Sequence, residues 1–177
     1  MTDTPAFTSR HHNRISALHN DVTAWRRDLH AHPEIGFEEV RTSGIVAEKL
    51  KAFGVDEVLT GIATTGVVGI VRGRAKGPMI GLRADMDALP MQEFGEVSYQ
   101  STVPGKMHAC GHDGHTAMLL GTAKLLAESR DFAGSVALIF QPAEEGGGGG
   151  RVMVEEGLFE KANCETVWGL HNWPDLP

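Results

Sequence analysis

The 177-residue sequence predicts a three-layer α/β sandwich. Amphipathic helical segments alternate along the chain with short apolar runs that have the character of strands. One of these runs, SVALIFQ at 135–141, is continuously apolar, as expected of a strand that is buried on both faces of a sheet. Hydrophobic residues make up 41% of the chain and charged residues 22%, which is typical of a globular domain.

Two helices are predicted first. The apolar positions of the first helix recur at spacings of three and four residues: Ile15, Leu18, Val22, Trp25 and Leu29. This helix should end near 32–33, where a proline follows a histidine. The second helix is predicted over 38–53, with Gly54 as its stop.

The strand-like runs begin after the second helix. The runs at 67–73 and 78–85 are joined by a basic turn that contains glycine, and this pattern predicts a β-hairpin. A helix is predicted over 115–129, ahead of the buried strand. A glycine-rich loop and a short helix near 151–156 follow that strand, and the last strand is predicted over 166–173.

Charge and hydropathy narrow the function classes. The formal net charge is -7 and no like charges cluster, which argues against nucleic acid as the main partner. The first residues lack the apolar core of a signal peptide, and no apolar run is long enough to span a membrane. We therefore expect a cytoplasmic protein with a flexible N-terminus over residues 1–14. Cys110 and Cys164 lie in different contexts and do not suggest a disulfide framework.

The residues with chemical potential fall in four places. RADMDALP at 83–90, QPAEEGGGGG at 141–150 and GLHNW at 169–173 each follow the end of a predicted strand, and KMHACGHDGHT at 106–116 precedes a predicted helix. Sites in α/β sheets collect at the carboxyl ends of strands, because loops converge there while the sheet stays rigid. The four clusters are therefore predicted to form one site.

The ligand types in these clusters favour a metal. Cys110 and His112 form a C-x-H pair, which can reach one ion from a loop or extended segment. Glu144 and Glu145 are adjacent, so one can bind metal while the other faces substrate as a base. His171 would supply a further nitrogen. A lone strand-end histidine is more often structural and adjacent glutamates are usually solvated, but their joint occurrence shifts the interpretation to a metal site.

Other polar residues are candidates for supporting roles. Asp85 and Asp87 lie two apart and share a face on an extended chain, so they could orient ligand histidines; an Asx turn before Pro90 is the alternative. Three more residues beside the C-x-H pair could touch ligands or substrate: His108, Asp113 and His115. One of the two histidines is expected to be structural.

Five segments resemble one family. DLHAHPEIGFEEVRTS, LRADMDALP, MHACGHDGHTAMLLG, FQPAEEGGGGGRVM and GLHNW look like the metal-dependent amidohydrolases typified by hippurate hydrolase, the aminoacylases and the plant auxin-conjugate hydrolases. The resemblance implies a zinc-exopeptidase-like sandwich with a mixed, mostly parallel sheet, of which residues 15–177 would be the N-terminal part of the catalytic domain. It implies that the metal ligands are Cys110, His112, Glu145 and His171. It also implies that Glu144 is the general acid/base and that Asp87 is the supporting catalytic aspartate.

The resemblance also implies parts that this sequence does not contain. Family members are about twice as long, and beyond the position of Pro177 they carry a lid and dimerisation domain and one more ligand histidine. Full-length relatives are expected to be homo-oligomeric through the lid. The implied cofactors are two divalent ions, zinc or manganese first, with cobalt or nickel as alternatives. The implied partner is a small N-acyl amino acid, and neither nucleic acid nor a membrane is expected.

The predicted reaction is hydrolysis of an amide by a metal-activated water, with Glu144 moving the proton. The sequence does not choose between hippurate, acetylated amino acids, diaminopimelate derivatives and short peptides. Two alternatives remain open: a metal-binding fragment without turnover, and a hydrolase in which Cys110 is a nucleophile activated by His112 or His115.

Overall fold

The computed structural model describes residues 12–173. Of the predicted flexible segment 1–14, residues 1–11 lie outside this range, and residues 12–14 belong to a helical stretch that continues to residue 17. Among the described residues, no helix is both long enough and apolar enough to cross a lipid bilayer.

The two predicted N-terminal helices are present with shifted starts. The first, α2, covers His19–Ala31 after a turn at residue 18, so Ile15 lies outside it and is 59% exposed rather than part of the core. The second, α3, covers Val40–Ala52. Its start is fixed by the carboxylate of Glu34, which accepts hydrogen bonds from two backbone N–H groups of the first helical turn, and Gly54 ends it in the left-handed conformation as predicted.

Five strands form one mixed sheet in the order β1-β2-β4-β3-β5. Their bounds are β1 Glu57–Ile62, β2 Gly66–Arg72, β3 Ala75–Asp85, β4 Ala133–Gln141 and β5 Thr166–Gly169. Strand β2 runs antiparallel to both of its neighbours, whereas β3 runs parallel to β4 and to β5. All strands except β2 therefore point in one direction, which confirms the mixed, mostly parallel sheet.

The predicted hairpin between 67–73 and 78–85 is wrong. β2 and β3 follow each other in the chain, but β4 lies between them in the sheet and pairs with both. The first six residues of β2 are all buried, and a strand buried to this extent needs a neighbour on each side. The hairpin partner of β2 is β1, which the sequence analysis missed because EVLTGI mixes polar and apolar residues without alternation.

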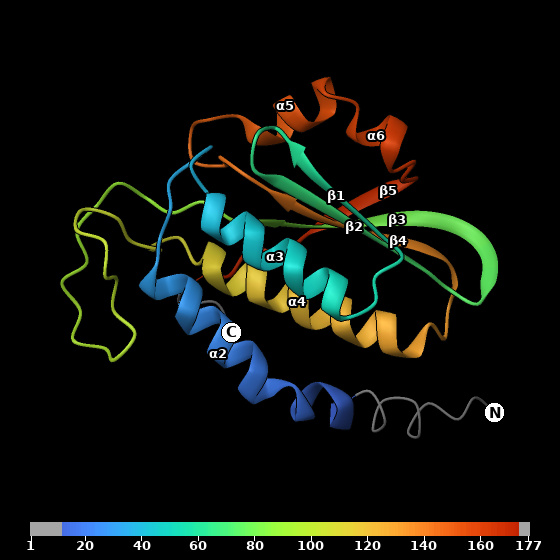
Figure 1. The fold of residues 1–177 in the computed structure, drawn as a ribbon, viewed down its shortest axis with the longest axis horizontal. Helices are drawn as coiled ribbons and strands as arrows, with labels where there is room; N and C mark the ends of the chain where they lie inside the picture. Colours follow the sequence, from blue (N-terminus) through green and yellow to red (C-terminus); the bar gives the residue numbers. More distant parts are fainter. Residues whose placement is uncertain (1–11, 174–177) are drawn as a thin grey trace.

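Helices cover both faces of the sheet, as the three-layer prediction requires (Figure 1). On one face, α2, α3 and α4 (His112–Ser129) lie over a core that includes Phe140, Leu50 and Leu120. On the other, α5 (Gly149–Glu155) and α6 (Leu158–Lys161) cover a smaller core around Ile139. Neighbouring residues 139 and 140 thus point into different cores, as a strand buried on both faces demands.

Strand β5 is shorter than predicted and lies at an edge of the sheet. It ends at Gly169 instead of residue 173, and all four of its residues are exposed. Its register with β3 runs from Ile80 opposite Thr166 to Arg83 opposite Gly169, and Asp85 of β3 pairs with Gln141 of β4. The carboxyl ends of β3, β4 and β5 therefore meet at one edge, where the loops that follow them converge.

Candidate metal centre

His112 lies at the middle of the converging loops. It is the first residue of α4, follows Gly111 in the left-handed conformation, and is completely buried. Within residues 12–173 its Nε2 has no hydrogen-bond partner, although three carboxylate oxygens surround it: Asp85 Oδ2 at 3.5 Å, Glu145 Oε1 at 3.9 Å and Glu144 Oε2 at 4.0 Å. A buried imidazole nitrogen thus faces a cluster of carboxylates.

Cys110 and His171 complete this cluster. Cys110 lies in the loop before α4, and its Sγ is 3.4 Å from His171 Nε2. Potential ligand atoms lie within 4.8 Å of one another in three groups, all of which contain His112: with Cys110 and His171, with Asp85 and His115, and with Glu144 and Glu145. The structure therefore brings all four residues predicted as ligands, and the predicted base, to one place.

Asp87 supports His112 and the glutamate loop at the same time. His112 Nδ1 lies 2.9 Å from the Asp87 carbonyl oxygen and 3.3 Å from its Oδ1, and the backbone N–H of Glu145 donates to Asp87 Oδ2 at 2.9 Å. Burial alone would raise the pKa of Asp87, but the hydrogen bonds from His112 and from the backbone of the loop lower it below the ordinary value of 3.8. The carboxylate is held ionised and turns His112 Nε2 towards the carboxylates of Asp85, Glu144 and Glu145.

Asp85 binds a different histidine. Its Oδ1 is 2.6 Å from His115 Nδ1, and its Oδ2 accepts a hydrogen bond from Arg83 Nη1 at 2.7 Å. Burial raises the pKa of Asp85, but His115, His112 and Arg83 together lower it below 3.8. Both aspartate side chains thus engage histidines, which is the geometry predicted for orienting groups rather than for an Asx turn.

The charged surroundings shift two pKa values in the cluster. Burial lowers the pKa of His112, but Asp87 and Asp85 outweigh burial and raise it above 6.5. Burial and the nearby carboxylate of Glu145 raise the pKa of the Cys110 thiol to about 11. A nucleophilic cysteine needs a lowered pKa, so this environment disfavours the alternative in which Cys110 attacks substrate.

Asp113 and His108 lie outside the three groups of ligand atoms. Asp113 points towards α2, where its Oδ2 is 2.7 Å from Arg26 Nε and 2.8 Å from His30 Nδ1. His30 continues this buried network to Glu93. Burial lowers the pKa of His108 to about 4, and neither of its ring nitrogens has a partner in the described part of the chain. Of the two histidines, His115 belongs to one of the groups of potential ligand atoms and His108 does not. Which of the two touches ligands or substrate stays a prediction.

Sequence analysis missed Glu39, which anchors the loop that carries Glu144 and Glu145. The completely buried Glu39 accepts hydrogen bonds from the Ala143 backbone N–H at 2.8 Å and from the Thr65 hydroxyl at 2.6 Å. Burial raises its pKa above 4.5. Its position in the segment EIGFEEV was the available signal, but a glutamate beside a helix start is ordinarily a solvated residue.

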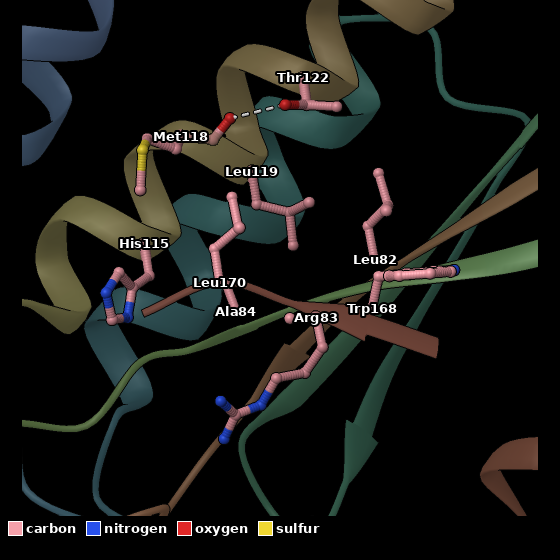
Figure 2. Close-up of a pocket in the computed structure, with 10 residues that line it drawn as sticks. Leu82, Arg83, Ala84, His115, Met118, Leu119, Thr122, Trp168 and Leu170 are labelled. Carbon is pink, nitrogen blue, oxygen red and sulfur yellow. Dashed lines mark hydrogen bonds between the residues drawn. The ribbon is translucent and has the colours of Figure 1, made fainter. Parts of the chain in front are cut away.

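An apolar pocket of about 160 Å³ adjoins the cluster, between α4 and β5 (Figure 2). Met118 and Leu119 line it from α4, and Trp168 and Leu170 line it from β5 and the segment that follows. His115 is also part of its lining. Because His115 hydrogen-bonds Asp85, this imidazole is shared by the pocket and the acidic cluster.

Comparison with known proteins agrees with this geometry. Residues 81–177 match the model of peptidase family M20/M25/M40. The chain is 53% identical over 160 residues to the hippurate hydrolase of Campylobacter jejuni, covering 90% of this chain and 41% of that protein. It is 52% identical over 160 residues to the IAA-amino acid hydrolase ILR1-like 4 of Arabidopsis thaliana, covering 88% of this chain and 36% of that one.

A solved structure extends the likeness to three dimensions. The YXEP protein of Bacillus subtilis, described as a dinuclear metal binding peptidase of the M20 family, superposes with a TM-score of 0.86 at 44% identity. The superposition covers 92% of this chain and 45% of that one. The chain therefore spans about two fifths of the length of the curated relatives it matches.

Proposed function

The chain belongs to peptidase family M20/M25/M40, and from this membership and the geometry of its strand ends we propose that it carries the metal centre of a hydrolase that cleaves the amide bond of N-acyl amino acids. The names of two relatives describe hydrolysis of hippurate and of IAA-amino acids. Both substrates join an organic acid to an amino acid through an amide, which supports this substrate class.

The unpartnered His112 Nε2 carries the proposal. Leaving a buried polar atom unpaired costs about 1–3 kcal/mol, so its position among three carboxylates calls for a compensating cation. Thiol, imidazole and carboxylate are the donors that zinc accepts, and the donor set around His112 contains all three. The dinuclear relative supports a count of two divalent ions. Manganese, cobalt or nickel would also suit most of these ligands.

The proposed ligands are Cys110, His112, Glu145 and His171. Divalent ions bound by them would polarise the amide carbonyl and make a nearby water more acidic. Asp87 contributes by holding His112 Nδ1, so that Nε2 faces the ions, and by fixing the backbone of Glu145. Its role is to orient these ligands without touching substrate.

Glu144 is the proposed proton carrier. Its carboxylate oxygen lies 4.0 Å from His112 Nε2 at the edge of the cluster, and its side chain is 43% exposed against 30% for Glu145. Glu144 would accept a proton from the water that attacks the carbonyl carbon, and would then donate it to the amide nitrogen as the C–N bond breaks. The products are a carboxylate and a free amino acid.

Glu144→Gln tests the proposal. The wild-type chain and the variant would be loaded with zinc, manganese or cobalt and offered a panel of N-acyl amino acids, with release of free amine as the readout. Loss of the proton carrier should lower the rate about 10²–10⁴-fold while the metal content stays the same. Glu155→Gln is the matched control, because that exposed residue pairs with Arg151 on the surface of α5.

Three results would contradict parts of the proposal. A Glu144→Gln variant with the wild-type rate would remove Glu144 from this role. A wild-type chain that binds no divalent ion would contradict the proposed metal centre. A chain that binds ions but releases no amine from any substrate would support the alternative of a metal-binding fragment.

A further inference from the structure

His171 lies two residues beyond the end of β5, where pairing with the sheet has stopped. Strand β5 ends at Gly169 and pairs only with β3, so residues 170–173 have no strand partner. The polar contacts of the His171 ring are with Cys110 Sγ at 3.4 Å and with the carbonyl oxygen of the next residue at 2.6 Å. Neither contact ties this exposed segment to a rigid element, yet a metal ligand has to be held in place.

The next residue, Asn172, supplies the missing attachment to α4. Its side-chain amide lies directly over Gly111, between the two predicted ligands of the C-x-H pair, and a Cβ atom at Gly111 would overlap this amide. Gly111 also has a φ of 90°, in the left-handed region. Two independent features therefore require glycine at this position, and one of them is contact with Asn172.

Asn172 also joins a chain of hydrogen bonds that runs inwards to the buried contact between His115 and Asp85. His115 Nε2 lies 3.1 Å from the Asn172 backbone nitrogen and 2.5 Å from its side-chain oxygen. His115 Nδ1 is held by Asp85, and Asp85 by Arg83. Arg83 Nε then donates to Gln141 Oε1 at 2.9 Å. This chain connects the segment after β5 with α4 and with the ends of β3 and β4.

We infer that Asn172 is a positioning residue that locks His171 against Cys110 by inserting its amide over Gly111 and bonding to His115. The part of this inference that concerns metal rests on the proposed function, whereas the lock itself is a property of the metal-free chain. Figure 2 shows the His115 ring on α4 at the end that faces the segment following β5.

The lock can be tested without metal. In the metal-free protein, ¹⁵N relaxation of the backbone amides of 170–173 should give order parameters near 0.85, and Asn172→Ala should lower them below about 0.6. Asn163→Ala is the matched control, because Asn163 is equally exposed and precedes β5. Equal order in the wild type and in Asn172→Ala would overturn the inference.

Metal affinity provides the second test. In zinc competition with a chelating dye, Asn172→Ala should raise the dissociation constant of one zinc ion by about 10–100-fold. His171→Ala should weaken the same ion, and adding Asn172→Ala to it should cause no further loss, because the lock acts only through that ligand. Additive losses in the double variant would show that Asn172 does not act through His171.

A pair of glycine variants tests the contact between Gly111 and Asn172. Gly111→Ala and Gly157→Ala both place a Cβ at a residue with positive φ, 90° and 86° respectively, but only the first collides with Asn172. Only Gly111→Ala should weaken zinc binding. Lower order parameters for 170–173 in Asn172→Ala would support the lock even if the wild-type chain bound no zinc. The absence of zinc binding would refute only the proposed metal centre.

Discussion

Asp87→Asn tests how one buried carboxylate supports two parts of the centre. Asp87 accepts a hydrogen bond from His112 Nδ1 through one oxygen and from the backbone N–H of Glu145 through the other. An asparagine has the same shape, but its NH₂ group must face one of these two donors. One buried donor is then left unpaired, and we expect the free energy of unfolding of the metal-free protein to fall by about 1–3 kcal/mol.

The same substitution should weaken metal binding, since His112 loses the carboxylate charge beside Nδ1 and keeps the contact with the backbone carbonyl of residue 87. Removing such a partner typically costs 10–100-fold in affinity, or about 1.4–2.8 kcal/mol at about 1.4 kcal/mol per factor of ten. Urea unfolding of the metal-free protein and zinc competition measure the two effects separately. Asp131→Asn is the control, because its side chain is 73% exposed and far from the cluster. Unchanged stability and zinc affinity in Asp87→Asn would refute this account of Asp87.

Two further predictions concern the loop anchor. Burial raises the folded-state pKa of Glu39 above 4.5, so the protonated carboxyl stabilises the fold below pH 4.5 and this contribution is lost as the pH rises through the folded pKa. The stability of Glu39→Gln relative to wild type should therefore increase from pH 4.5 to neutral pH in urea unfolding, and Glu38→Gln, which alters an exposed side chain, should show no such trend. Gly36→Ala would bring a Cβ to 2.9 Å from Ala143 Cβ, and this overpacking should destabilise the fold by about 1–3 kcal/mol and lower the melting temperature. Gly44→Ala places a Cβ in open space within α3 and should stabilise the fold by about 0.5–1 kcal/mol. Equal melting temperatures for these two glycine variants would contradict the close packing at Ala143.

The site was predictable where its signal is local. The C-x-H pair, the adjacent glutamates and His171 each follow or precede a recognisable element, and parallel strands bring their ends together. The continuously apolar run at 135–141 likewise identified the central strand, because only a strand with neighbours on both sides and helices on both faces is buried in this way.

Features that depend on distant partners were not predictable. The order of strands in the sheet follows from long-range pairing. β4 therefore lies between β2 and β3, although the local sequence pattern predicted that these two strands form a hairpin. The role of Glu39 is revealed by its hydrogen bond with Ala143, which is 104 positions away in the sequence. The role of Asn172 is revealed by its contact with His115, which is 57 positions away. A polar residue whose partner lies so far along the chain has the same local sequence character as a solvated one.

X-ray absorption at the zinc edge tests the central claim most directly. The chain would be loaded with zinc, dialysed and compared with its Cys110→Ser variant. We predict one sulfur ligand at about 2.3 Å in the wild type, together with nitrogen and oxygen ligands near 2.0–2.2 Å, and loss of the sulfur signal in the variant. A spectrum with no sulfur in the wild type, or a protein that retains no zinc, would contradict a metal centre built on Cys110 and His112.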